Sequence, residues 1–131
     1  MATLTHITDK RIPASSLPGR VITASEIVDF SAKNAASGDI IQALNIKAGQ
    51  TVLRAGVNVI TAEGSTATAK LGDGSDDDRY GASINFNSAT TQSNSAVTYK
   101  YASADTIDIV AGAALANAKV MVWAEITTTV S

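Results

Sequence analysis

The densest group of side chains that could do chemistry is the run from Gly72 to Arg79, which reads G-D-G-S-D-D-D-R. Four carboxylates on such a loop could bind Ca²⁺, which takes roughly six to eight oxygen ligands. The EF-hand pattern fails, because counting from Asp73 the sixth position is Asp78 rather than glycine and the twelfth is Ile84 rather than glutamate. A calcium site of another type stays open as an alternative. We expect instead a solvated hairpin loop that Arg79 partly neutralises, with no metal and no other cofactor.

Residues that could form a catalytic group are scarce. Cysteine is absent and the single imidazole is His6, near the N-terminus, whereas a serine or threonine nucleophile needs a positioned base. The phosphate-binding patterns G-x-x-x-x-G-K-[ST] and G-x-G-x-x-G and the nucleophile pattern G-x-S-x-G do not occur. Asp105, Asp108 and Glu125 fall near strand ends or on outer strand faces, not as a pair in a groove. We therefore predict no enzyme activity and no catalytic residues.

The aromatic side chains divide into expected core residues and one expected contact residue. Four of them share strand faces with Val, Ile and Ala, which predicts core packing: Tyr80, Phe86, Tyr99 and Tyr101. Trp123 differs, because it lies on the strand face opposite Val120 and Val122. Large aromatic residues are enriched in protein interfaces, so we expect Trp123 in a subunit contact.

Residues 1–20 differ in composition from the rest of the chain. They contain both prolines and three basic residues against the single acid Asp9. Because proline lacks an N–H donor and disfavours helix before it, we predict an extended arm, with an unattached terminus as the alternative. A basic arm ahead of an acidic body suggests docking on a neighbouring surface. The expected interface residues are accordingly Lys10, Arg11, Pro13, Pro18 and Arg20, together with Trp123.

The elements that must position these residues are short strands. Between Asp39 and Ile126 apolar residues recur with period two, and turns of Gly, Asp, Asn and Ser separate the runs. Seven or eight strands at this spacing predict an all-β antiparallel β-sandwich of jelly-roll-like type. Residues 21–38 are ambiguous between a short helix and a strand, and Gly56 suggests a bulge or a close backbone approach.

Length and composition limit the possible classes of protein. The 131 residues predict an arm over 1–20 and one β-sandwich domain over 21–131. A net charge of -2 gives no overall attraction to nucleic acid or to anionic membranes. No apolar run is long enough to span a membrane and no signal peptide is recognisable, so we expect synthesis in the cytoplasm. Charged residues are only 17% of the chain, which favours an exterior partly covered by other subunits.

Several runs resemble small virion structural proteins of tailed bacteriophages, of the capsid decoration (cement) type. They read D-I-I-Q-A-L-N-I-K-A-G-Q-T-V-L, V-N-V-I-T-A-E-G-S-T-A-T-A-K-L-G-D-G-S-D-D-D-R-Y, A-D-T-I-D-I-V and K-V-M-V-W-A-E-I, within 39–126. The resemblance implies a β-sandwich that binds the outside of an assembled head, usually as a trimer at local threefold positions. It also implies that such a protein clamps neighbouring major capsid protein subunits together.

The sequence therefore predicts a structural protein with the major capsid protein and further copies of itself, as a homotrimer, for partners. We expect neither nucleic acid nor membrane as a partner, and we expect it on the capsid exterior of a virion assembled in the host cytoplasm. The alternative is a tail-fibre or host-attachment domain that binds surface glycans through the Asp73–Asp78 and Asn87–Ser95 loops. The scarcity of aromatic residues near those loops counts against that alternative.

Overall fold

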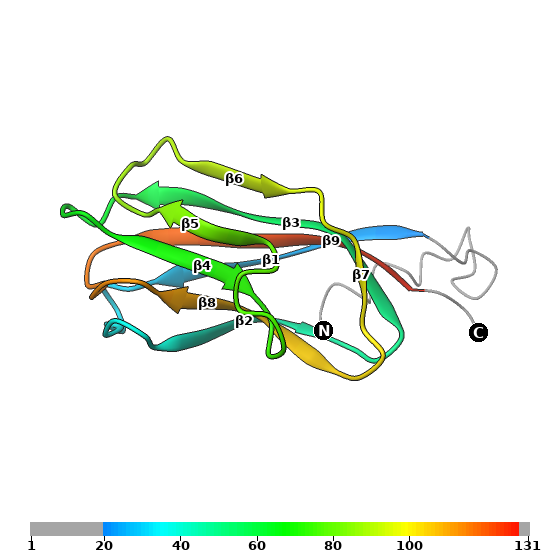
Figure 1. The fold of residues 1–131 in the computed structure, drawn as a ribbon. Coiled ribbons are helices and arrows are strands. Elements are labelled where there is room, and N and C mark those ends of the chain that lie inside the picture. The colour runs from blue at the N-terminus through cyan, green and yellow to red at the C-terminus, as the bar shows by residue number, and fades with distance from the viewer. Residues whose placement is uncertain (1–19, 129–131) are drawn as a thin grey trace.

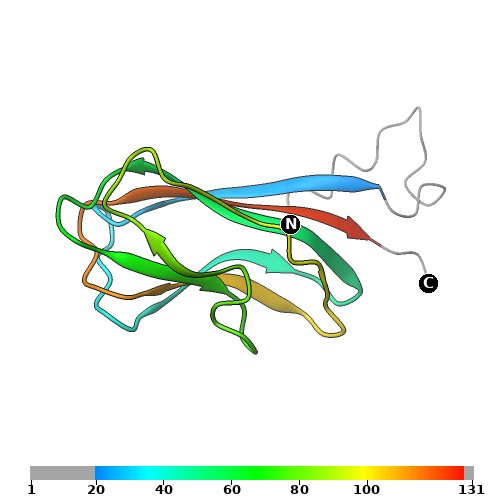
Figure 2. The ribbon, with the colours of Figure 1, turned by 45° about the horizontal axis from the view of Figure 1, so that its top comes forward.

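The computed structural model describes residues 20–128, and every regular element in this range is a β-strand. The strands form two antiparallel sheets that pack face to face, as Figures 1 and 2 show. This arrangement confirms the all-β sandwich predicted from the sequence. In residues 20–128 there is no helix of the length and apolarity needed to cross a membrane.

Each sheet has a core of four neighbouring strands. In order across the first sheet they are β1 (Val21–Asp29), β9 (Lys119–Thr128), β3 (Gln50–Thr61) and β6 (Gln92–Ser95), and the short β7 (Tyr99–Lys100) also pairs with β3. In order across the second sheet they are β2 (Ile40–Ile46), β8 (Asp105–Ala111), β4 (Thr68–Gly72) and β5 (Gly81–Asn85).

The strand order is that of a jelly roll. The chain passes from one sheet to the other at most of its connections, and its first and last strands, β1 and β9, lie side by side. Nine strands occur where seven or eight were expected. The additional one arises because β6 and β7 pair with successive parts of the same edge of β3, as one interrupted strand.

The ambiguous segment after the arm is a strand. β1 pairs with β9 in an unbroken antiparallel register from Val21 opposite Thr127 to Asp29 opposite Lys119. β-Branched residues make up about half of this segment, which suits a pleated surface better than a helix. β9, with apolar residues on both faces, is a central strand between β1 and β3.

The core lies between the sheets and consists mainly of small and β-branched side chains. Val57, Val120 and Val122 of the first sheet are fully buried, as are Ile107 and Ile109 of the second. Alternation along each strand places these residues inward and their polar neighbours outward. The first sheet therefore has a second, outer face, on which the expected contact residue lies.

Candidate functional site

The predicted interface residues fall in two regions. Lys10, Arg11, Pro13 and Pro18 lie outside the described residues, so their role in an interface stays a prediction. Arg20 is half-buried and directly precedes β1. The structure therefore describes the surroundings of Trp123 in detail. For the arm, it describes only the residue that joins it to β1.

Trp123 lies on the outer face of the first sheet, where β9 pairs it with Ser25 of β1 and Gly56 of β3. Its indole rests on Gly56: a Cβ atom there would come within 2.7 Å of Cζ2 of Trp123 and 2.1 Å of the Ser93 carbonyl oxygen. The close approach predicted at Gly56 is therefore confirmed. Because glycine leaves this space open, the large indole lies along the sheet and stays half-buried without a partner protein.

An apolar patch surrounds Trp123. Its other members are Met121, half-buried on β9, and Ile27 of β1, which pairs with Met121 and is 49% exposed. We call these three residues the outer-face patch. Large apolar side chains side by side on an exposed sheet are typical of the centre of a protein contact.

Two ion pairs border the outer-face patch. Nε of Arg54 lies 3.3 Å from the Glu125 carboxylate, and Nζ of Lys119 lies 4.0 Å from that of Asp29. All four side chains are partly exposed, so each pair contributes little to stability. An apolar centre with a polar rim is the usual layout of a surface that binds another protein.

The acidic loop between β4 and β5 is built around one buried carboxylate. Nε of Arg79 donates to Oδ2 of Asp73 at 2.6 Å, and the Tyr101 hydroxyl donates to the same oxygen at 2.7 Å. The backbone N–H groups of Ser75 and Asp76 donate to Oδ1 at 3.0 and 2.9 Å. The loop joins β4 and β5 and Arg79 neutralises an acid, as predicted, but the expectation of a solvated loop is wrong for Asp73, which is buried.

The charge of Asp73 is held by its hydrogen bonds. Burial disfavours the ionised form, but the donors Arg79 and Tyr101 and the two backbone N–H groups outweigh it and lower the pKa of Asp73 to about 2. Burial raises the pKa of Tyr80 to about 12 and raises that of Tyr101 as well. Near neutral pH the network therefore contains one carboxylate, one guanidinium and two neutral phenols.

Aromatic contacts extend this network onto the first sheet. The Tyr80 and Tyr101 hydroxyl oxygens are 2.7 Å apart, and the guanidinium of Arg79 lies 3.6 Å from the ring centroid of Tyr99. The prediction of core packing is confirmed for Tyr80, Phe86 and Tyr101. It is wrong for Tyr99, which is 36% exposed: its ring lies at the margin of the core, between the guanidinium of Arg79 and the edge-on ring of Tyr101.

The other acids of the loop lie at its surface. Carboxylate oxygens of Asp76, Asp77 and Asp78 come within 4.8 Å of one another, and Asp77 pairs with Lys70 at 3.2 Å. Asp73 is engaged by Arg79 and does not join this group. Three carboxylates, those of half-buried Asp76 and exposed Asp77 and Asp78, fall short of the ligand number that Ca²⁺ requires, and a cation at this loop stays an untested alternative.

Sequence reasoning missed a second buried carboxylate, Glu63, at the opposite end of the sandwich. It accepts hydrogen bonds of 3.0 Å from the backbone N–H groups of Ala116, Asn117 and Ala118. Burial opposes ionisation, but these donors lower the pKa of Glu63. Glu63 thus fixes the β8–β9 loop to the β3–β4 loop. Its only sequence signal was a lone acid before a glycine, which is too common to be informative.

Asp108 is a further buried acid. It alternates with the core residues Ile107 and Ile109, so it lies on the outer face of its sheet as expected, yet it is only 5% exposed. Burial raises its pKa, although the Thr106 hydroxyl donates a hydrogen bond of 2.5 Å to it.

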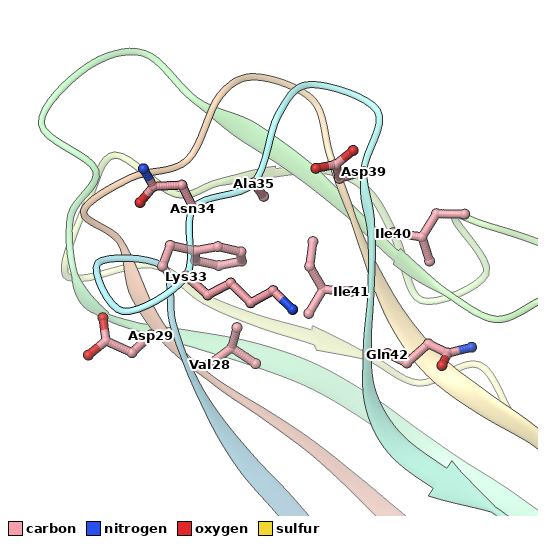
Figure 3. Close-up of a pocket in the computed structure, with 10 residues that line it drawn as sticks. Val28, Asp29, Lys33, Asn34, Ala35, Asp39, Ile40, Ile41 and Gln42 are labelled. Carbon is pink, nitrogen blue, oxygen red and sulfur yellow. The ribbon is translucent and has the colours of Figure 1, made fainter.

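A groove of about 640 Å³ lies where the end of β1 faces the start of β2 (Figure 3). Val28, Phe30 and Ile41 contribute apolar lining, and Asp29 and Asp39 contribute acidic groups. Lys33 also lines the groove. The groove therefore has a lining of mixed charge and lies beside the outer strands β1 and β2 of the two sheets.

Comparison with known proteins identifies the fold. The sequence matches no protein-family model and no curated protein. A chain of the capsid asymmetric unit of cyanophage Pam1 matches with a TM-score of 0.71 at 17% identity, over 86% of this chain and 87% of that one. A chain of the capsid of Ralstonia phage GP4 matches at 0.68 and 14%, over 88% of both chains. A chain of the acidic stable capsid of Helicobacter pylori bacteriophage KHP30 matches at 0.65 and 13%, over 85% and 90%. At these identities the likeness shows a shared fold.

Proposed function

We propose that this chain is a structural virion protein of a tailed phage that binds the outside of the capsid as a homotrimer. In this role it is a non-enzymatic decoration (cement) protein that stabilises contacts between major capsid protein subunits. Its partners are the capsid surface and further copies of itself.

The observation that carries this proposal is the extent of the likeness to three phage capsid chains. Each match covers 85–88% of this chain and 87–90% of the other. The shared fold is thus nearly the whole of each capsid chain and not one module of a larger protein. A chain of this size that resembles capsid chains over most of their length suits a small accessory subunit.

The surface supports the same role. The outer-face patch offers Ile27, Met121 and Trp123 to a partner, with ion pairs at its rim. The buried carboxylates Asp73 and Glu63 fix the loops at the two ends of the sandwich, which suits a rigid body under mechanical load. Because many copies bind one shell, each contact can be weak and the shell is still stabilised.

The test is a binding experiment with two surfaces. Purified protein is mixed with undecorated phage heads and, separately, with host cells, and bound protein is quantified after sedimentation. Saturable binding to heads at a fixed copy ratio, with heads that then resist heat or chelator better, is expected. Binding only to cells would overturn the proposal in favour of a host-attachment domain.

A pair of variants ties the binding to the outer-face patch. Ile27→Lys places a charge in the patch and is expected to lower head binding at least tenfold. Val97→Lys, at an apolar residue of similar exposure (42%) in the β6–β7 connection, is the matched control and is expected to bind normally. Equal binding by both variants would remove the patch from the interface.

A further inference from the structure

The outer edge of β1 is a long and regular sheet edge. β1 is the first strand of its sheet, so one side of its backbone has no strand partner within residues 20–128. Its nine residues pair with β9 without a register shift and include neither proline nor lysine. Natural edge strands are usually short, bulged or interrupted by such residues, because an open edge pairs with other strands.

The edge strands of the second sheet differ in this respect. β5 has only five residues and its pairing with β4 contains a register shift between Ala69 and Leu71. The pairing of β2 with β8 shifts between Gln42 and Leu44. Across the described strands, a long edge without a strand partner and without a bulge is therefore a feature of β1 that the edge strands of the second sheet do not share.

The edge of β1 is also acidic. Glu26 is exposed and forms no ion pair within the described part of the chain. Asp39 lines the adjoining groove together with Lys33 and Asp29, the latter being paired with Lys119. Because Glu26 lies between Ala24 and Val28 on the same, inward-facing side of β1, a purely apolar strand would pair poorly here and a strand with a basic residue would be selected.

The chain itself contains a segment of the required chemistry. Residues 3–8 read T-L-T-H-I-T, in which four of six residues are β-branched and none is glycine or proline. Asp9, Lys10 and Arg11 follow, with an excess of positive charge. By composition, residues 3–11 are a strand-forming segment with a basic end.

The connection to β1 allows another copy as the acceptor. Residues 12–19 include Pro13 and Pro18, which restrict the backbone to extended conformations at and before each proline. At about 3.1 Å per residue, eight such residues span about 25 Å. A connection of that extended length would be long enough for residues 3–11 to reach another copy.

We propose that residues 3–11 of one copy pair with the free edge of β1 in a neighbouring copy, with Lys10 or Arg11 next to Glu26. Each copy then donates one strand and accepts one. Such a heterologous contact closes into a ring when the rotation between copies permits, three copies being the smallest ring that leaves donor and acceptor on different neighbours. This inference takes from the proposed function only the expectation that the protein forms a homo-oligomer. It can therefore be tested without a capsid.

The first test uses charge reversal in the full chain and measures molar mass by light scattering. The wild type is expected to be a trimer at tens of micromolar. Lys10→Glu combined with Arg11→Glu, or Glu26→Lys alone, is expected to shift the mass toward the monomer, and combining all three changes is expected to restore the trimer. Asp77→Lys, the same charge change on the exposed β4–β5 loop, is the control and is expected to leave the mass unchanged.

The second test identifies the pairing directly. Isotopically labelled and unlabelled full chains are mixed, dissociated, reassociated and treated with a carbodiimide, which joins an amine to a carboxylate in contact. Peptides that join Lys10 of one isotope to Glu26 or Asp29 of the other are expected. A monomeric wild type, a trimer that the charge reversals leave intact, or cross-links only within one isotope would each overturn the proposal. A swapped trimer that fails to bind heads would instead overturn the proposed function alone.

Discussion

The Tyr101 hydroxyl donates a 2.7 Å hydrogen bond to Oδ2 of Asp73, the same oxygen that Nε of Arg79 binds at 2.6 Å. The two residues are 28 positions apart and belong to different parts of the sandwich: Asp73 follows β4 of the second sheet, and Tyr101 follows β7 of the first. One buried carboxylate therefore connects the two sheets at this end of the molecule.

Replacing this carboxylate tests its contribution to stability. Asp73→Asn keeps the size of the side chain but leaves Arg79, whose side chain is 15% exposed, without its anion. Loss of one partner of a buried ion pair costs about 3 kcal/mol, and we expect that decrease in the free energy of unfolding in urea at neutral pH. Asp77→Asn, which removes an exposed ion pair with Lys70, is expected to cost about 0.5 kcal/mol. Equal losses in the two variants would contradict the assignment.

Acid stability follows from the lowered pKa of Asp73. Since its pKa is about 2 in the folded protein and about 3.9 in an unfolded chain, the unfolded state binds more protons between these values. Asp73 therefore stabilises the fold above pH 4 by about 2.6 kcal/mol, and this contribution disappears as the pH falls from about 4 to about 2. Urea unfolding of wild type and Asp73→Asn across this range is expected to show converging stabilities. A gap that stays constant down to pH 2 would contradict the prediction.

The period-two patterns made the sheets predictable, while the partners of polar residues were not. Alternation places Ile107 and Ile109 inward whatever their neighbours, so the core and the sandwich class followed from the sequence. Within the ambiguous segment 21–38, Val21–Asp29 forms a strand because β9 supplies a continuous partner for it. Tertiary pairing of this kind outweighs local propensity, and no local pattern contains it.

The buried carboxylates show why the site was harder to predict. Within the run of four acids near Arg79, Asp73 differs from the exposed Asp77 and Asp78 in its burial and in a hydrogen bond from the distant Tyr101. Glu63 is buried because the β8–β9 loop directs three N–H groups at it, a contact across more than fifty residues. Sequence composition correctly singled out the acidic loop, but long-range hydrogen bonds determine which acid is structural.

Glu63 is expected to hold the β8–β9 loop in place. Glu63→Ala leaves the N–H groups of Ala116, Asn117 and Ala118 without their acceptor, and a buried donor left unsatisfied costs about 1–3 kcal/mol. We expect the free energy of unfolding to fall by about 3 kcal/mol and hydrogen exchange at these three amides to accelerate more than exchange at β3. Glu125→Ala, which removes the exposed partner of Arg54, is the control and is expected to change neither measurement appreciably. Unchanged protection at 116–118 would show that other acceptors hold the loop.

Gly56 is expected to control the position of Trp123. In Gly56→Ala the new methyl group would meet the Ser93 carbonyl oxygen at 2.1 Å and the indole at 2.7 Å, so β6 and the ring must both move. Because Trp123 is the only tryptophan of the chain, its emission reports this movement directly, and we expect a red shift together with a loss of about 2 kcal/mol in stability. Gly49→Ala is the matched control. Because Gly49 has a φ of +88°, alanine there strains the backbone by about 1 kcal/mol, but its Cβ would meet no atom within 4 Å. Its emission is expected to equal that of the wild type, and a red shift in both variants would mean that general loosening, not loss of the Gly56 space, exposes the indole.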